Sequence, residues 1–125
     1  MAFSTKLLAL ATAGIVLGSL QYAVPAMAAP EIMSRTCRVD QVGVFGNRIH
    51  VKCAPIADTA YTSAIPYYAM AINTDARVID SVIALAIAAK QTNKPLVVQF
   101  DMADYASVPG CQGNNCRKLV AAMLE

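Results

Sequence analysis

The four cysteines, Cys37, Cys53, Cys111 and Cys116, are the residues with the clearest chemical consequence. An even number of cysteines in a small secreted chain is typical of disulfides. The neighbours in sequence, Cys37 with Cys53 and Cys111 with Cys116, each bracket a turn, and we expect these two bridges. The alternative for Cys111 and Cys116 is a metal-binding or redox pair, although their four-residue spacer is not the Cys-x-x-Cys spacing of such sites.

The single histidine, His50, is the one obvious general base. It alternates with Arg48 and Lys52, and two neighbouring cations make an imidazole a poor proton acceptor. We therefore expect His50 to be an exposed strand residue. Asp101 and Asp104 could be paired carboxylates or calcium ligands, but no further acid lies near them, and solvation in a loop is the better interpretation.

Other catalytic signatures are missing from the sequence. It has no glycine-rich phosphate loop, zinc-ligand spacing or nucleophile elbow. We therefore predict no enzymatic activity, no metal and no cofactor. An enzyme that uses His50 with Asp101 or Asp104 is the alternative.

Tyrosines are the candidate ligand-binding residues. Aromatic faces on a β-rich domain can stack against sugars or peptides, whereas tyrosine in a strand can equally be half-buried packing. We select Tyr67, Tyr68 and Tyr105 as ligand-binding candidates and note that Tyr61 precedes them in a polar connection.

The N-terminal residues 1–28 have the pattern of a cleavable signal peptide. Lys6 provides a positive charge, residues 7–20 are apolar, and Ala26 and Ala28 are the small residues before the cleavage point. An uncleaved membrane anchor is the alternative. We expect an exported protein, periplasmic or secreted, with one domain at residues 29–125 and no membrane contact after cleavage.

Charge does not select a partner. The chain has ten Lys and Arg and eight Asp and Glu, a net charge of +2, and loss of Lys6 with the signal leaves +1. This balance argues against nucleic acid as a partner.

The remaining pattern predicts a mainly β domain with one helix. Strands are expected at residues 38–42, 48–53, 65–72 and 96–100. The last segment, 118–124, is expected to be a fifth strand, with a short helix as the alternative because of its alanines. Residues 29–36 read as a poorly restrained leader.

A helix is expected between the third and fourth strands. Asn73, Thr74 and Asp75 indicate its N-terminus, with a capping side chain and an acid in the first turn. Asn93, Lys94 and Pro95 end it after about Gln91. Its apolar positions cover about half of its circumference, so we expect it to bury more than one face. One explanation for this wide apolar arc is burial across the open end of the domain's own barrel.

The fold class expected from this order is α+β, mainly β: a small five-stranded OB-like barrel with one helix between strands 3 and 4. Three segments of the sequence carry a more specific resemblance to a known family. These are Asn-Arg-Ile-His-Val-Lys-Cys at residues 47–53, the helix with Lys-Pro-Leu-Val-Val at 94–98, and the cysteine loop at 110–117. In these segments the chain resembles the B subunits of subtilase-cytotoxin-type AB5 toxins and related small secreted bacterial proteins.

The resemblance implies a glycan-binding module that assembles as a homo-oligomer, a ring of five. The Asp and Ser that such subunits carry near the first strand are not recognisable around residues 38–44. That difference counts against the glycan more than against the fold. In such a ring, helices of neighbouring subunits meet, which is a second explanation for the wide apolar arc of the helix. From the resemblance and the tyrosines we expect an exported, disulfide-stabilised binding module with a glycan ligand. A small periplasmic structural or accessory protein without catalysis is the alternative.

Overall fold

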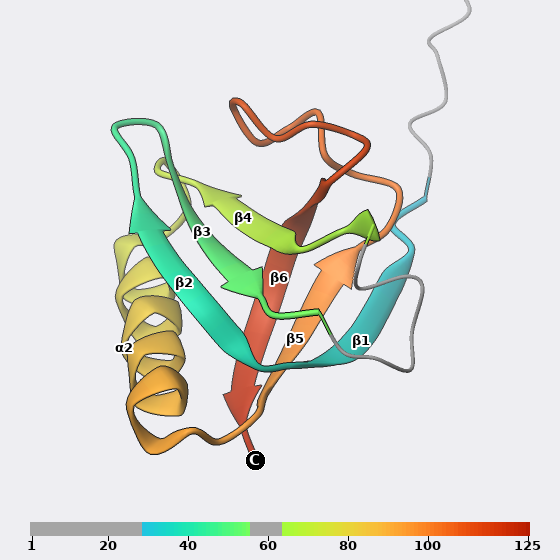
Figure 1. Cartoon of the computed structure of the whole chain (residues 1–125). Helices are drawn as coiled ribbons and strands as arrows, with labels where there is room; N and C mark the ends of the chain where they lie inside the picture. The colour runs from blue at the N-terminus through green and yellow to red at the C-terminus, as the bar shows by residue number, and fades with distance from the viewer. Residues whose placement is uncertain (1–28, 56–63) are drawn as a thin grey trace, which may run out of the picture.

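The structure of the chain, a computed structural model, describes residues 29–55 and 64–125 (Figure 1). The expected signal peptide and Tyr61 lie outside these residues. The elements, in chain order, are β1 (Ile32–Cys37), β2 (Val39–Val44), β3 (Arg48–Cys53), β4 (Tyr67–Ala71), α2 (Ala76–Thr92), β5 (Leu96–Asp101) and β6 (Cys116–Leu124). The described part is therefore a small β-rich domain with one long helix.

The sheet contains six strands rather than the expected five. The additional strand is β1, in the segment that was expected to be a loose leader. It pairs antiparallel with β5 along its whole length, from Ile32 opposite Asp101 to Cys37 opposite Leu96. Its partner lies about 60 residues away in sequence, so the local pattern gave no indication of the pairing. The last segment is a strand and not a helix.

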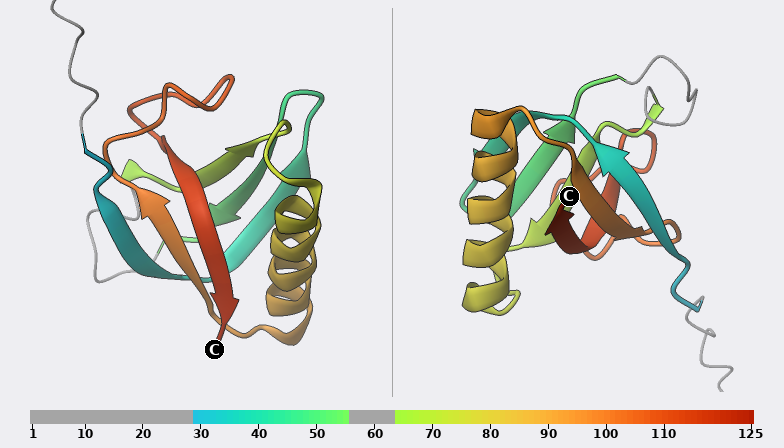
Figure 2. Two further views of the ribbon diagram at one scale, coloured as in Figure 1. Left: turned by 180° about the vertical axis from the view of Figure 1, so that it is seen from behind. Right: turned by 90° about the horizontal axis from the view of Figure 1, so that it is seen from below.

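The order of strands in the sheet is β1-β5-β6-β4-β3-β2, and every neighbouring pair is antiparallel except β4 with β6. The two outer strands, β1 and β2, are consecutive in the chain and are separated by Arg38 alone. The same stretch of backbone therefore supplies both outer strands of a strongly curved sheet (Figure 2).

The helix α2 begins and ends close to the expected positions. Asp75 is the N-cap, and its carboxylate accepts a hydrogen bond from the Arg77 backbone N–H at 2.9 Å. Asn93 ends the helix in the left-handed conformation, with φ of 52°. The start and stop signals are confirmed, but the acid expected in the first turn is the N-cap itself, and the first turn contains no acid.

The helix packs against β2, β5 and β6 and buries a single face. Its buried residues are Ile79, Val82, Ala86 and Ala89. The expectation that more than one face is buried is wrong for this chain, because the two flanks of the apolar arc remain open. Val78 on one flank is 40% exposed and Ile87 on the other is 42% exposed.

Both expected disulfides are present. Cys37–Cys53 joins the end of β1 to the end of β3 inside the core, where both cysteines are fully buried. Cys111–Cys116 closes a short turn in front of β6. In the loop-entropy model they contribute about 3 and about 2 kcal/mol, a large share for a domain of this size.

None of the described helices is long and apolar enough to cross a membrane.

Candidate functional site

His50 lies on the outer face of β3 but is only 7% exposed. Its ring is flanked by Phe45 and Tyr67, with centroids at 5.0 and 5.1 Å. Gly43 is its partner across the β2–β3 hairpin and leaves room for the ring. The prediction of an exposed histidine is therefore wrong. The imidazole lies in the space that Gly43 leaves on β2, and the rings of Phe45 and Tyr67 cover it.

This environment disfavours the protonated form of the imidazole. Burial lowers the pKa of His50, and the charges of Arg48 and Lys52 lower it further. The Nε2 atom is buried and has no hydrogen-bond partner among the described residues. The effect of Arg48 and Lys52 on the His50 pKa was predicted from the sequence, whereas the burial of the ring was not.

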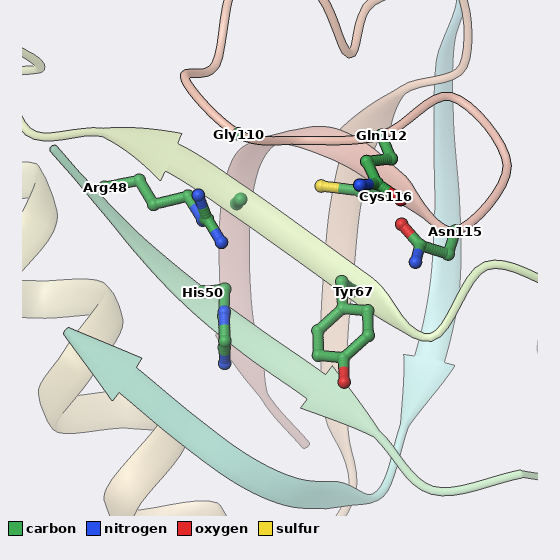
Figure 3. A pocket seen from close by; sticks show the side chains of 8 residues that line it. Arg48, His50, Tyr67, Gly110, Gln112, Asn115 and Cys116 are labelled. Carbon is green, nitrogen blue, oxygen red and sulfur yellow. The ribbon is translucent and has the colours of Figure 1, made fainter. Parts of the chain in front are cut away.

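A pocket of about 230 Å³ lies beside His50, between the outer faces of β3 and β4 and the loop that joins β5 to β6 (Figure 3). We call this connection, residues 102–115, the β5–β6 loop. The lining residues are Arg48, His50, Tyr67, Ala69, Gly110, Gln112, Asn115 and Cys116. Two strands thus form the floor of the pocket, and the disulfide-closed end of the loop forms its wall.

The chemistry of this lining is that of a polar binding site. Tyr67 offers a half-buried ring, and Gln112 and Asn115 offer amide donors and acceptors. Arg48 adds a guanidinium, whereas Ala69 lies beneath the other lining residues and is itself fully buried. The eight lining residues include no carboxylate and no hydroxyl other than that of Tyr67. This set can hydrogen-bond a polar ligand that also presents an apolar face.

The β5–β6 loop is held at its base by Arg117. The Nε atom of Arg117 donates to the Met102 carbonyl at 2.9 Å, and Nη1 donates to the carbonyls of Gly113 and Cys116 at 2.6 and 2.7 Å. The Tyr67 backbone N–H also donates to the Asn115 carbonyl at 3.1 Å. These contacts keep the pocket wall next to β4.

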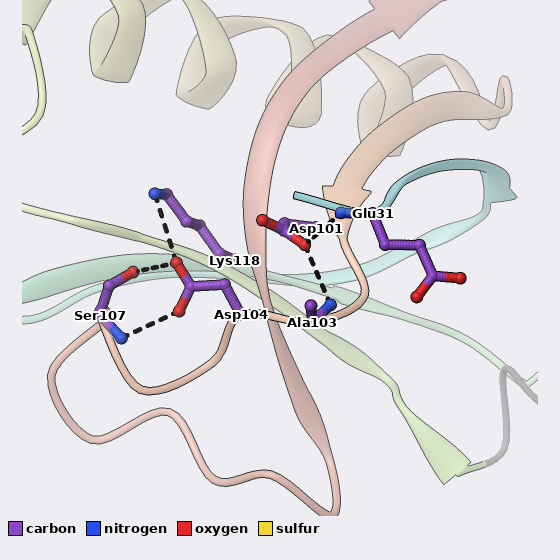
Figure 4. A network of polar contacts seen from close by, with 6 residues as sticks. All are labelled: Glu31, Asp101, Ala103, Asp104, Ser107 and Lys118. Atoms are coloured by element: carbon purple, nitrogen blue, oxygen red, sulfur yellow. Dashed lines mark hydrogen bonds and ion pairs between the residues drawn. The ribbon is translucent and has the colours of Figure 1, made fainter. Parts of the chain in front are cut away.

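The two aspartates have structural contacts instead of simple solvation (Figure 4). Asp101 is 8% exposed, and its carboxylate accepts hydrogen bonds from the backbone N–H groups of Glu31 and Ala103, both at 3.0 Å. It therefore ties the start of β1 to the start of the β5–β6 loop. The expectation of a solvated side chain is wrong for Asp101.

Asp104 organises a turn within the same loop. Its carboxylate accepts hydrogen bonds from the Ser107 N–H and hydroxyl and pairs with the Lys118 ammonium at 3.4 Å. Burial by itself would raise the pKa of Asp104, but these partners outweigh it and hold the pKa below its usual value.

The structure separates the three candidate tyrosines. Tyr67 lines the pocket, whereas Tyr68 is fully buried in the core, with its ring 4.8 Å from that of Phe100. Neighbours in a strand point to opposite faces, which explains the difference. Tyr105 is 42% exposed on the β5–β6 loop and lies 5.6 Å from the Arg117 guanidinium. Tyr68 thus has no surface to offer a ligand.

Several pocket residues were not identified from the sequence. Gln112 and Asn115 lie inside the Cys111–Cys116 turn, and the clustering of amides within a disulfide-closed loop is the signal that could have indicated them. Arg48 was considered only as a neighbour of His50. Among the described residues, no group of three or more His, Cys, Asp or Glu is placed to hold a metal ion.

Comparison of the chain with protein-family models, with curated proteins and with solved structures gives no match.

Proposed function

We propose that this protein is an exported binding module with an OB-like barrel, and that the pocket around Tyr67 takes a glycan. The observation that carries the proposal is the composition of the pocket. It combines the aromatic face of Tyr67 with amide groups from Gln112 and Asn115. Sugars present the same combination, since their rings have apolar faces and their hydroxyls donate and accept hydrogen bonds.

The strand connections support an OB-like barrel. If β1 and β2 are taken as one bent strand, the pairing becomes a five-stranded circuit in which that strand contacts both β3 and β5. OB-folds bind oligosaccharides and oligonucleotides on the face of their second and third strands, between two specific loops. The pocket has the corresponding position, on β3 and β4 beside the β5–β6 loop.

The two disulfides support export, since disulfides persist mainly in oxidising compartments. The near-neutral charge of the domain favours a sugar over a nucleic acid among the ligands that OB-folds take. No step of chemistry is proposed for the site.

The B-subunit-like part of the proposal is a homo-oligomer, a ring of five. Its support is the apolar surface on both sides of α2. One groove, beside β2, includes Val42, Val44, Ile83 and Ile87, and the other, beside β6, includes Val78, Leu85, Val120 and Ala122. Two different apolar surfaces on one chain allow head-to-tail contacts, and these form a ring when the rotation between subunits closes. Native mass spectrometry of the oxidised protein tests this part, and a monomer would contradict it.

A glycan array probed with the oxidised protein tests the ligand proposal. We expect binding to a subset of glycans, and we expect Asn115→Ala to reduce it. Asn114→Ala is the matched control, because Asn114 is exposed on the same turn and does not line the pocket. The absence of binding to any glycan would contradict the sugar ligand and favour an accessory protein without a small-molecule ligand.

A further inference from the structure

Arg48 connects two parts of the molecule that are far apart in sequence. It begins β3, and its Nη1 atom donates a hydrogen bond to the Pro109 carbonyl at 2.9 Å, 61 residues away. Its guanidinium also lies over the Phe45 ring, 4.9 Å from the centroid. One side chain thus links the β2–β3 turn to the β5–β6 loop at the rim of the pocket (Figure 3).

Gly110 is shaped to receive this guanidinium. Its φ is +72°, a conformation that side-chain-bearing residues rarely adopt. A Cβ atom at this position would lie 1.9 Å from Nη1 of Arg48 and 3.0 Å from Cζ. The positive φ favours glycine here, and a Cβ atom would displace the Arg48 guanidinium from its present position.

The remaining contacts hold the other parts of the loop. Arg117, the Cys111–Cys116 bridge and the Tyr67 N–H fix the segments next to β6 and β4. Arg48 instead contacts residues 109 and 110, which the Cys111–Cys116 ring does not enclose. Arg117 therefore holds the end of the pocket wall next to β6, and Arg48 on β3 holds the part at residues 109 and 110.

We propose that Arg48 is a positioning residue: through Pro109 and Gly110 it holds the β5–β6 loop where the loop forms the pocket wall. The hydrogen bond sets the distance between the wall and β3, and the contact with Phe45 fixes the guanidinium. Release of Arg48 removes the side-chain contact that ties residues 109 and 110 to β3, so this short stretch between the buried Val108 and the Cys111–Cys116 bridge can move away from β3 and widen the pocket. This role deepens the proposed function, but its test does not need a ligand.

Hydrogen exchange of the backbone amides of residues 108–113, measured on the oxidised full-length domain, is the direct test. We expect Gly110→Ala and Arg48→Gln to accelerate exchange in this segment by about five-fold or more, while exchange in β5 and α2 stays unchanged. Arg48→Lys keeps the charge but loses the planar fork, and an intermediate acceleration is expected. Gly46→Ala is the matched control, because a Cβ there has open space.

Equal exchange of residues 108–113 in wild type, Arg48→Gln and Arg48→Lys would overturn the proposal. These two variants also carry the test if Gly110→Ala does not fold. If the glycan array identifies a ligand, its dissociation should be faster in Arg48→Lys than in Gly46→Ala, and equal dissociation rates would also overturn the proposal. If no glycan binds, the proposed ligand fails, whereas the exchange measurement still decides the role of Arg48.

Discussion

Gly43 lies directly opposite His50 in the β2–β3 hairpin, and a Cβ at residue 43 would come within 2.6 Å of the His50 Nε2 atom. Two further glycines have the same relationship to large side chains near the pocket. Gly110 makes room for Arg48, and Gly113 makes room for Tyr105, whose Cζ would lie 2.7 Å from an added Cβ. Gly43 and Gly110 thus receive side chains from another element, whereas Gly113 receives one from its own loop.

Gly43→Ala should destabilise the domain by about 1–3 kcal/mol, because the buried imidazole has to move between Phe45 and Tyr67 to avoid the new methyl group. Urea unfolding of the oxidised protein measures the loss. Gly46→Ala, in the same hairpin but facing open space, is the control and should change the unfolding free energy far less. Equal effects of the two variants would show that His50 is not held against residue 43.

Stability should depend on pH through His50. Its pKa is lowered in the folded state by burial and then by Arg48 and Lys52, from an ordinary value of 6.5. Below that value the unfolded chain takes up a proton that the folded chain resists, so the free energy of unfolding should fall as pH drops from about 7.5 to about 5. Urea midpoints across this range at constant ionic strength test the prediction.

His50→Gln should flatten that pH dependence, since the chain has no other histidine. Asp104 acts in a separate window: its pKa is lowered below 3.8, so the stability it contributes is lost only at more acidic pH. An equal slope between pH 5 and 7.5 in wild type and His50→Gln would contradict the role of His50.

The two disulfides should differ in their response to reductant. Cys111 is partly exposed at the protein surface, whereas Cys37 and Cys53 are fully buried. A dithiol reductant should therefore open Cys111–Cys116 first, at a cost of about 2 kcal/mol, and Cys37–Cys53 only near global unfolding, at about 3 kcal/mol. Alkylation of freed thiols followed by peptide mass spectrometry gives the order. Simultaneous reduction of both bridges under native conditions would contradict it.

Asp101→Ala should cost about 1–3 kcal/mol, because the backbone N–H groups of Glu31 and Ala103 lose their acceptor in a largely buried position. Asp80→Ala is a suitable comparison, since Asp80 is an exposed helix residue. Thermal unfolding measures both. If the Asp101 side chain were merely solvated, the two variants would lose equally little stability, and this result would contradict the prediction.

Local signals predicted most of the elements of the fold. The helix start signal at residues 73–75, the stop signal at residues 93–95 and the alternation of residues 48–53 each depend on neighbouring residues, and the structure has a helix and a strand at these places. The β1 strand was missed because its pairing with β5 is long-range and its own sequence, Ile-Met-Ser-Arg-Thr-Cys, lacks a clear alternation.

The site was less predictable because it also depends on contacts between residues far apart in sequence. Alternation placed His50 on the outer face correctly, but its burial depends on Phe45, Gly43 and Tyr67, which three different elements or turns supply. The pocket forms only when the β5–β6 loop folds back over β3 and β4, and no local pattern specifies that contact. Tyr67 is the candidate that the sequence and the pocket share.

The most direct test of the proposed function compares Tyr67→Ala with Tyr105→Ala in a titration with the strongest glycan from the array. Tyr67 lines the pocket, whereas Tyr105 is exposed and lies outside its lining. We expect Tyr67→Ala to weaken binding by about ten-fold or more, Tyr67→Phe to weaken it less, and Tyr105→Ala to leave it within about two-fold of wild type. Equal affinities of Tyr67→Ala and wild type would contradict glycan binding in this pocket.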